Sequence, residues 1–140
     1  MSHIVEYPFL SSFSREHLDL ILAHAVEVQF DPGEVVFKEN DPANRFYLIE
    51  YGKVALETHL PHDGDTVVQT LARGDVLGWS WLFPPFAWHF QTRALEPTNA
   101  LAIDGAHLLG LAGRNHDLGF ELMKRMAQVV IQRLQATRRR

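Results

Sequence analysis

Six aromatic side chains lie within thirteen consecutive residues, in the segment GWSWLFPPFAWHF from Gly78 to Phe90. All three tryptophans of the chain belong to this segment. An indole donates one hydrogen bond and accepts none, and a phenylalanine ring has no polar atom. The rings therefore favour stacking and burial, which predicts a core, a ligand pocket or a contact surface.

The eight histidines are the other side chains that could do chemistry, as metal ligands. The best-spaced set is Glu57, His59 and His62, which is similar to the ligand set of metal-dependent cupin-type enzymes. A His-x-x-His spacing does not place both rings on one strand face, and HLPHDG is typical of a turn. We keep the cupin-type enzyme as an alternative and favour exposed loop histidines.

Nucleophilic catalysis finds no support in the sequence. The chain has no cysteine, and Ser80 has neither a neighbouring base nor a Gly-x-Ser-x-Gly turn around it. We therefore expect no catalytic residue, no metal and no cofactor, and we do not expect an enzyme.

The bulk properties indicate one water-soluble domain. The 140 residues fit a single core, and a formal net charge of −4 argues against nucleic-acid binding by the whole surface. The basic run Arg138–Arg140 is typical of a solvated helix end, with a nucleic-acid or acidic-partner contact as the alternative. No apolar run reaches the roughly 18 residues of a membrane span, and no secretion signal is present at the N-terminus. We expect a cytoplasmic protein without a membrane partner.

Turn signals divide most of the chain into short segments. A helix-like apolar stripe follows Ser14, a residue that can cap a helix. From Val26 the apolar residues alternate as in half-buried strands, with a turn signal about every eight to twelve residues. The turn signals are Pro32-Gly33, Asp41-Pro42, Gly52, Asp63-Gly64 and Gly74. This spacing predicts an antiparallel roll or barrel.

The segment after Asn115 is typical of a long helix with two apolar stripes. One stripe has the 3,4 spacing of a coiled-coil seam and consists of Phe120, Met123, Ala127, Val130 and Leu134. The second stripe consists of Leu118, Leu122, Met126 and Val129. Two stripes allow the helix to pack on its own chain and on a partner, so we predict a homodimer through the first stripe. One wide stripe buried in the same chain is the alternative.

The segment FDPGEVVFKENDPANRFYLIEYGKVALE resembles the first half of the cyclic nucleotide-binding domain, the sensor domain of catabolite-activator-type regulators. The resemblance rests on Phe30, Gly33, Asp41, Tyr47-Leu48-Ile49, Gly52 and Val54 and extends over nearly the whole chain. It implies a mainly β fold with flanking helices, an antiparallel double-stranded β-helix of the jelly-roll-like β-roll type.

The same resemblance implies one domain over residues 1–140. Its parts are an N-terminal helical part over about 8–25, the roll over about 26–104 and C-terminal helices over about 105–137. Regulators of the family carry a helix-turn-helix domain after the long helix, whereas this sequence stops at Arg140. We therefore expect no helix-turn-helix domain and no direct DNA binding.

The resemblance also implies a phosphate-binding cassette that begins at Gly78. The family pattern has a Glu next, which accepts the ribose hydroxyl, and later an Arg followed by Ser or Thr, which hold the cyclic phosphate. Here Trp79 stands at the Glu position and His89-Phe90 at the Arg-Ser or Arg-Thr position. A buried phosphate charge without a partner is costly. Arg93 is a potential substitute, because residues 89, 91 and 93 share one face of a strand.

The sequence therefore predicts a divergent ligand-binding cassette. Its candidate residues are Gly78, Trp79, Ser80, Trp81, Trp88, His89, Phe90, Gln91 and Arg93. The rings either fill the pocket as core, line a pocket for a more apolar or aromatic ligand, or form a protein contact. We predict a regulatory sensor module that binds an unidentified small ligand or a protein partner, and not cAMP or cGMP. The alternative is the sensor half of a transcription regulator whose DNA-binding domain is missing or supplied by a partner.

Overall fold

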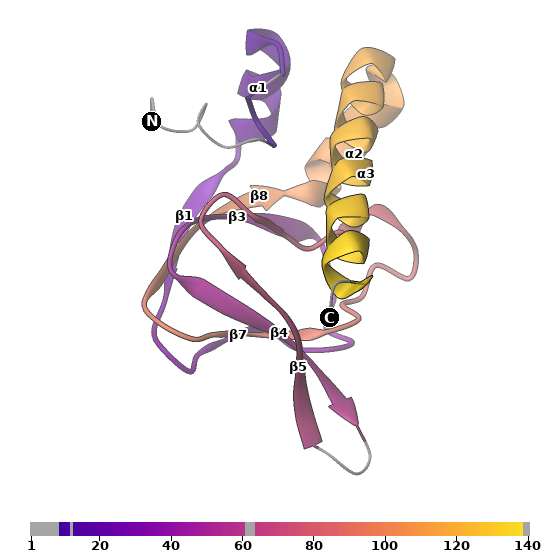
Figure 1. The fold of residues 1–140 in the computed structure, drawn as a ribbon. Coiled ribbons are helices and arrows are strands. Elements are labelled where there is room, and N and C mark those ends of the chain that lie inside the picture. Colours follow the sequence, from indigo (N-terminus) through magenta and orange to yellow (C-terminus); the bar gives the residue numbers. More distant parts are fainter. Residues whose placement is uncertain (1–8, 12, 61–63, 139–140) are drawn as a thin grey trace.

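The computed structural model describes residues 9–11, 13–60 and 64–138 (Figure 1). The helices are α1 (Arg15–Leu22), the short 3-10 helix η2 (Ser80–Leu82), α2 (Gly105–Arg114) and α3 (His116–Arg138). The strands are β1 (Val26–Phe30), β2 (Val35–Phe37), β3 (Arg45–Tyr51), β4 (Lys53–Leu60), β5 (Gly64–Ala72), β6 (Val76–Leu77), β7 (Gln91–Ala94) and β8 (Thr98–Asp104).

The strands form two four-stranded antiparallel sheets, in the orders β1-β8-β3-β6 and β2-β7-β4-β5. Figure 1 shows α1 on one side of the strands and the β4–β5 hairpin extending away on the other. This arrangement confirms the predicted mainly β roll with flanking helices. No helix among the described residues is long and apolar enough to cross a membrane.

Local sequence signals explain where these elements begin and end. The Ser14 hydroxyl accepts a hydrogen bond from the His17 amide at 3.2 Å, which confirms the predicted cap of α1. Gly52 joins β3 to β4 with a φ of +98°, and an added Cβ there would lie 2.5 Å from the Pro97 carbonyl oxygen. Glycine is therefore required at this corner for both its backbone conformation and its lack of a side chain. Asp63 of the predicted hairpin signal lies outside the described residues.

Two buried clusters share the strand β3. Phe46 and Leu48 belong to the cluster that continues into the helices, whereas Tyr47 and Ile49 belong to the cluster inside the roll. Because successive side chains of a strand point to opposite faces, β3 is buried on both sides and has no polar face. The helices therefore pack on one face of β3, and the aromatic stretch contributes a tryptophan to each face, Trp81 on the helix side and Trp88 inside the roll.

The two apolar stripes of α3 have different surroundings. The second stripe is buried against the roll and the other helices, with Leu118 and Leu122 both 0% exposed. The first stripe faces outward, and Phe120 and Leu134 are 67% and 58% exposed. The expected division of α3 into an inner and an outer apolar face is therefore present. Pairing of the outer face with a second chain stays a prediction.

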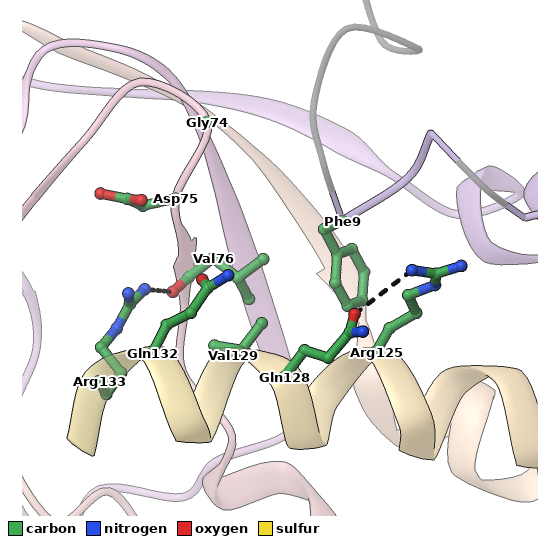
Figure 2. A pocket seen from close by; sticks show the side chains of 9 residues that line it. All are labelled: Phe9, Gly74, Asp75, Val76, Arg125, Gln128, Val129, Gln132 and Arg133. Atoms are coloured by element: carbon green, nitrogen blue, oxygen red, sulfur yellow. Dashed lines mark hydrogen bonds between the residues drawn. The ribbon is translucent and has the colours of Figure 1, made fainter. Parts of the chain in front are cut away.

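Residues on the inner side of α3 also bind the strand that leads into the aromatic stretch. Figure 2 shows α3 beside the turn at Gly74 and Asp75, where the Arg133 guanidinium donates a hydrogen bond to the Val76 carbonyl oxygen. Burial lowers the pKa of Arg133, and the nearby Asp75 carboxylate opposes this effect. The last turns of α3 are thereby held to β6, directly before Gly78.

Candidate functional site

The aromatic stretch divides its rings among two cores and the surface. Trp81 is 1% exposed and belongs to the cluster under the helices, whereas Trp88 is 5% exposed and belongs to the cluster inside the roll. Phe83 and Phe86 are on the surface, with 64% and 39% of each side chain exposed. The segment is therefore neither a uniform core nor a uniform contact surface.

Trp88 fills the space inside the roll next to Gly78. Its ring stacks on Phe37 with the ring centres 3.8 Å apart and the planes 8° from parallel. Gly78 has a φ of +101°, and an added Cβ would lie 2.7 Å from the indole. Glycine at this position therefore allows both the turn and the close approach of the tryptophan ring.

A cavity of about 30 Å³ remains beside this stack. Six of the predicted residues line it: Gly78, Trp79, Ser80, Trp88, His89 and Phe90. Small-molecule sites usually measure about 300–1,000 Å³, whereas one water needs about 10–15 Å³. This cavity is therefore about the size of two water molecules and well below the usual size of a small-molecule site.

The sequence profile of the cyclic nucleotide-binding domain matches residues 27–115, which is more than half of the chain. The chain belongs to the cyclic nucleotide-binding domain family. Several relatives agree with this assignment. A candidate cyclic nucleotide-binding protein from Geobacter metallireducens has a solved structure with a TM-score of 0.86 and 31% identity, and the match covers 95% of this chain and 96% of that one.

Other relatives are parts of regulators. The cAMP-dependent protein kinase regulatory subunit of Schizosaccharomyces pombe is 35% identical over 77 residues, which are 55% of this chain and 18% of the subunit. The chain thus spans less than a fifth of that relative's length. The sensor domain of the transcriptional regulator DNR from Pseudomonas aeruginosa has a TM-score of 0.76 at 18% identity, with 96% of this chain and 90% of that one covered. At this identity the likeness shows the fold alone.

The divergent positions of the cyclic nucleotide-binding domain surround the small cavity. Trp79, at the family's Glu position, lines it together with His89 and Phe90, at the Arg-Ser or Arg-Thr position. These side chains supply no carboxylate and no guanidinium. Rings therefore stand at the positions that the family spacing assigns to the ribose and phosphate contacts.

Three of the predicted site residues lie elsewhere. Trp81 belongs to the other cluster and does not line the cavity. Gln91 and Arg93 do share one face of β7, as the strand period requires, but this face is opposite to that of the buried Thr92 and Ala94. We therefore remove Trp81, Gln91 and Arg93 from the cavity residues.

Arg93 and Gln91 bind Glu57 instead of facing the cavity. The Glu57 Oε1 atom accepts a hydrogen bond from Gln91 Nε2 at 2.8 Å and another from Arg93 Nε at 3.3 Å. Arg93 also donates to the Gly33 carbonyl oxygen at 2.9 Å. The Glu57 side chain is only 11% exposed, so its charge depends on these donors. The guanidinium that we considered as a phosphate ligand is thus part of a structural ion pair.

Replacing Arg93 with methionine is expected to lower the free energy of unfolding by about 1–3 kcal/mol, because the nearly buried Glu57 carboxylate loses a charged donor. Urea denaturation at neutral pH measures the effect. The double variant Arg93→Met/Glu57→Leu, which removes both charges, should recover part of the loss. A change below about 0.5 kcal/mol in the single variant would show that solvent replaces the arginine.

Tyr47 also packs near Phe37. The Phe37 and Tyr47 ring centres lie 6.3 Å apart with the planes 24° from parallel. Burial raises the pKa of Tyr47, and the charge of Arg45 and a hydrogen bond with it oppose that effect. The phenol therefore stays protonated and neutral near neutral pH, and it adds no negative charge to the interior of the roll.

Phe37, Leu56 and Leu77 also line the cavity, and the sequence did not identify them. They come from β2, β4 and β6, which are separated along the chain by many residues. An alternating pattern predicts that such residues point inward, but it does not show which of them converge. The family pattern used in the sequence analysis covers the cassette alone, so it does not include the residues of β2, β4 and β6 that face the cassette.

The metal-ligand set considered for a cupin-type enzyme does not form among the described residues. Glu57 already binds Gln91 and Arg93, and His62 lies outside the described residues. His59 lies on β4, and its side chain is not described. No group of three or more His, Asp or Glu residues that suits a metal ion occurs in the described part of the chain.

Proposed function

We propose that this chain is a regulatory sensor module in which the chain's own aromatic side chains occupy the nucleotide pocket, so that it does not bind cAMP or cGMP. The observation that carries the proposal is the Trp88–Phe37 stack at 3.8 Å beside a cavity of about 30 Å³. A nucleotide would have to displace a buried tryptophan before making any contact of its own.

The charges around the cavity support the same proposal. Of the described residues that line it, His89 alone carries a titratable side chain, and this side chain is exposed. Arg93 is engaged with Glu57 and Gly33 on the other face of β7. A cyclic phosphate placed here would lose its hydration without gaining a fixed cation.

Calorimetric titration with cAMP and with cGMP is expected to give dissociation constants in the millimolar range or weaker. Two charge-assisted contacts are replaced, and each such contact is typically worth about 2–5 kcal/mol when one partner is removed. The loss of both would weaken even a micromolar site beyond detection. Binding of either nucleotide with low-micromolar affinity would contradict the proposal.

Some structures of the same fold come from transcription regulators. They include the Catabolite Activator Protein of Thermus thermophilus, with a TM-score of 0.73 and 22% identity, where the match covers 92% of this chain and 59% of that one. At this identity, as with the sensor domain of DNR, the likeness shows the fold alone, so the sensor half of a transcription regulator stays an alternative to the stand-alone module. Co-purification of a DNA-binding protein with the chain would support this alternative over a stand-alone module.

We also infer that two copies pair through the outer face of α3. The exposed residues Phe120, Met123, Ala127, Val130 and Leu134 repeat with 3,4 spacing on one side of the helix. An exposed seam of this length is unusual on a monomer, because isolated surface apolar residues are scattered rather than aligned. In a two-fold dimer, the seam of one copy would be buried against the same seam of the other copy.

A further inference from the structure

We propose that an uncharged, mainly aromatic or apolar small molecule binds in a groove between the aromatic stretch and α2. The groove measures about 530 Å³ and is separate from the cavity beside Trp88, with which it shares no lining residue among those described. Its apolar walls come from Trp81, Phe86 and Leu109, and small residues stand at Ala43, Ala106 and Gly110. The inference builds on the proposed regulatory function by naming a different ligand site.

The floor of the groove is rigid. Trp81 stacks on Phe46 with ring centres 4.9 Å apart, and its indole Nε1 donates to the Gly78 carbonyl oxygen at 3.2 Å. Gly105, the first residue of α2, lies so close that an added Cβ would be 2.6 Å from the indole. The ring is only 1% exposed, so it supplies a rigid base, while the exposed Phe86 and the half-buried Leu109 supply the accessible apolar walls. A rigid base lowers the entropic cost of binding.

Phe86 is held at the rim in a strained conformation. Its φ is +55°, in the left-handed region that a bulky side chain seldom adopts. Its carbonyl oxygen accepts from the Ala43 amide at 2.7 Å, and its own amide donates to the Phe83 carbonyl oxygen at 2.9 Å. These bonds maintain the strain while the ring stays 39% exposed. Backbone strain of this kind is found most often at binding sites, where it holds a side chain in position to contact a ligand.

On the α2 side of the groove, Gly110 has no side chain to project into the space. It lies inside α2, where alanine would be more stable, and an added Cβ would meet no atom within 4 Å. Gly113 in the same helix has equally open surroundings but does not line the groove. The two glycines therefore form a matched pair in which only one substitution would obstruct the site.

The lining determines the class of occupant. None of the eight described residues that line the groove is charged, and Asn44 is the one with a polar side chain, so an ionised group would lose water without gaining a partner. A protein partner usually contacts about 20–30 residues on each side, far more than line this groove. The volume lies within the range of about 300–1,000 Å³ for small-molecule sites. The neutral lining and limited extent favour a small neutral molecule over a second protein.

A bound molecule would contact both the aromatic stretch and α2, which leads directly into α3. Binding would favour whichever arrangement of α2 fits the molecule, in proportion to its difference in affinity for the available arrangements. The groove would thus allow a ligand to affect the helices while the nucleotide pocket stays filled.

The test uses N-phenyl-1-naphthylamine, a neutral fluorescent aromatic probe, and indole as its competitor. Wild-type protein is expected to bind the probe saturably at one site, and Gly110→Leu should weaken this binding by about tenfold or more, since its side chain fills the groove. Gly113→Leu should bind like wild type. Equal loss in both glycine variants, or no saturable binding by wild type, would overturn the proposal.

Phe86→Asn is a second variant, which is useful if Gly110→Leu does not fold. Asparagine tolerates a positive φ, so the variant should be at least as stable as wild type while binding the probe about tenfold more weakly. Unchanged probe binding in this variant would count against the groove. A change of oligomeric state in either groove variant would assign the surface to a protein contact and overturn the proposal. Nucleotide calorimetry is a separate measurement, so each proposal fails independently of the other.

Discussion

Replacing Trp88 with alanine is expected to lower the free energy of unfolding by about 3–5 kcal/mol. The side chain is 5% exposed and stacks on Phe37, and Gly78 covers it from the side. Its removal leaves a void at the centre of the roll that neighbouring side chains cannot fill without moving their strands. Urea denaturation followed by circular dichroism measures the loss, because the substitution itself alters tryptophan fluorescence.

Phe83→Ala is the matched control for this substitution, because Phe83 belongs to the same stretch but is 64% exposed. Its expected effect is within about 0.5 kcal/mol of zero. A loss below about 1 kcal/mol for Trp88→Ala would show that the ring is not an essential part of the core. The interpretation of Trp88 as a permanent occupant of the nucleotide pocket would then fail.

A charged residue in the outer seam of α3 is expected to convert a dimer into a folded monomer. Val130 is 40% exposed in the single chain, so Val130→Glu should leave the fold and its unfolding transition largely unchanged. Across a two-fold axis, however, the substitution places two like charges in one apolar contact. Sedimentation equilibrium at tens of micromolar protein should give the dimer mass for wild type and the monomer mass for the variant.

Gln135→Glu is the control for the charge itself, because Gln135 is exposed on α3 but lies outside the 3,4 series. This variant should sediment as wild type does. If wild type is a monomer under these conditions, or if both variants dissociate alike, the seam is not the dimer contact.

The general fold could be predicted from the sequence because local rules determine most of it. Turn signals such as Gly52 and caps such as Ser14 act within a few residues, and each has the predicted role in the structure. The division of α3 into two faces also follows from its 3.6-residue period, since Leu122 is buried and Phe120 exposed.

The site could be predicted only in part, because its geometry depends on contacts between distant strands. Family spacing located the cassette at Gly78 but gave no means of telling that Trp88 faces Phe37 of β2 while Trp81 faces the helices. The strand period placed Gln91 and Arg93 on one face, yet it did not show that Glu57 on the neighbouring strand would bind both. Sequence patterns give the face of a residue, whereas the partner on that face comes from tertiary structure.

If Trp88 occupies the nucleotide pocket as proposed, it would also limit the number of mutational routes by which nucleotide binding could be gained. A carboxylate at position 79 and a guanidinium at position 89 would restore the charges of the family pattern. Neither group would contact a nucleotide as long as the Trp88 ring fills the interior of the roll. Removing Trp88 first would impose the stability loss before any gain in binding. Under this proposal the substitutions would be epistatic: each would be neutral or harmful alone, and their benefit would require all of them together. A pocket filled in this way would be difficult to convert to nucleotide binding one substitution at a time.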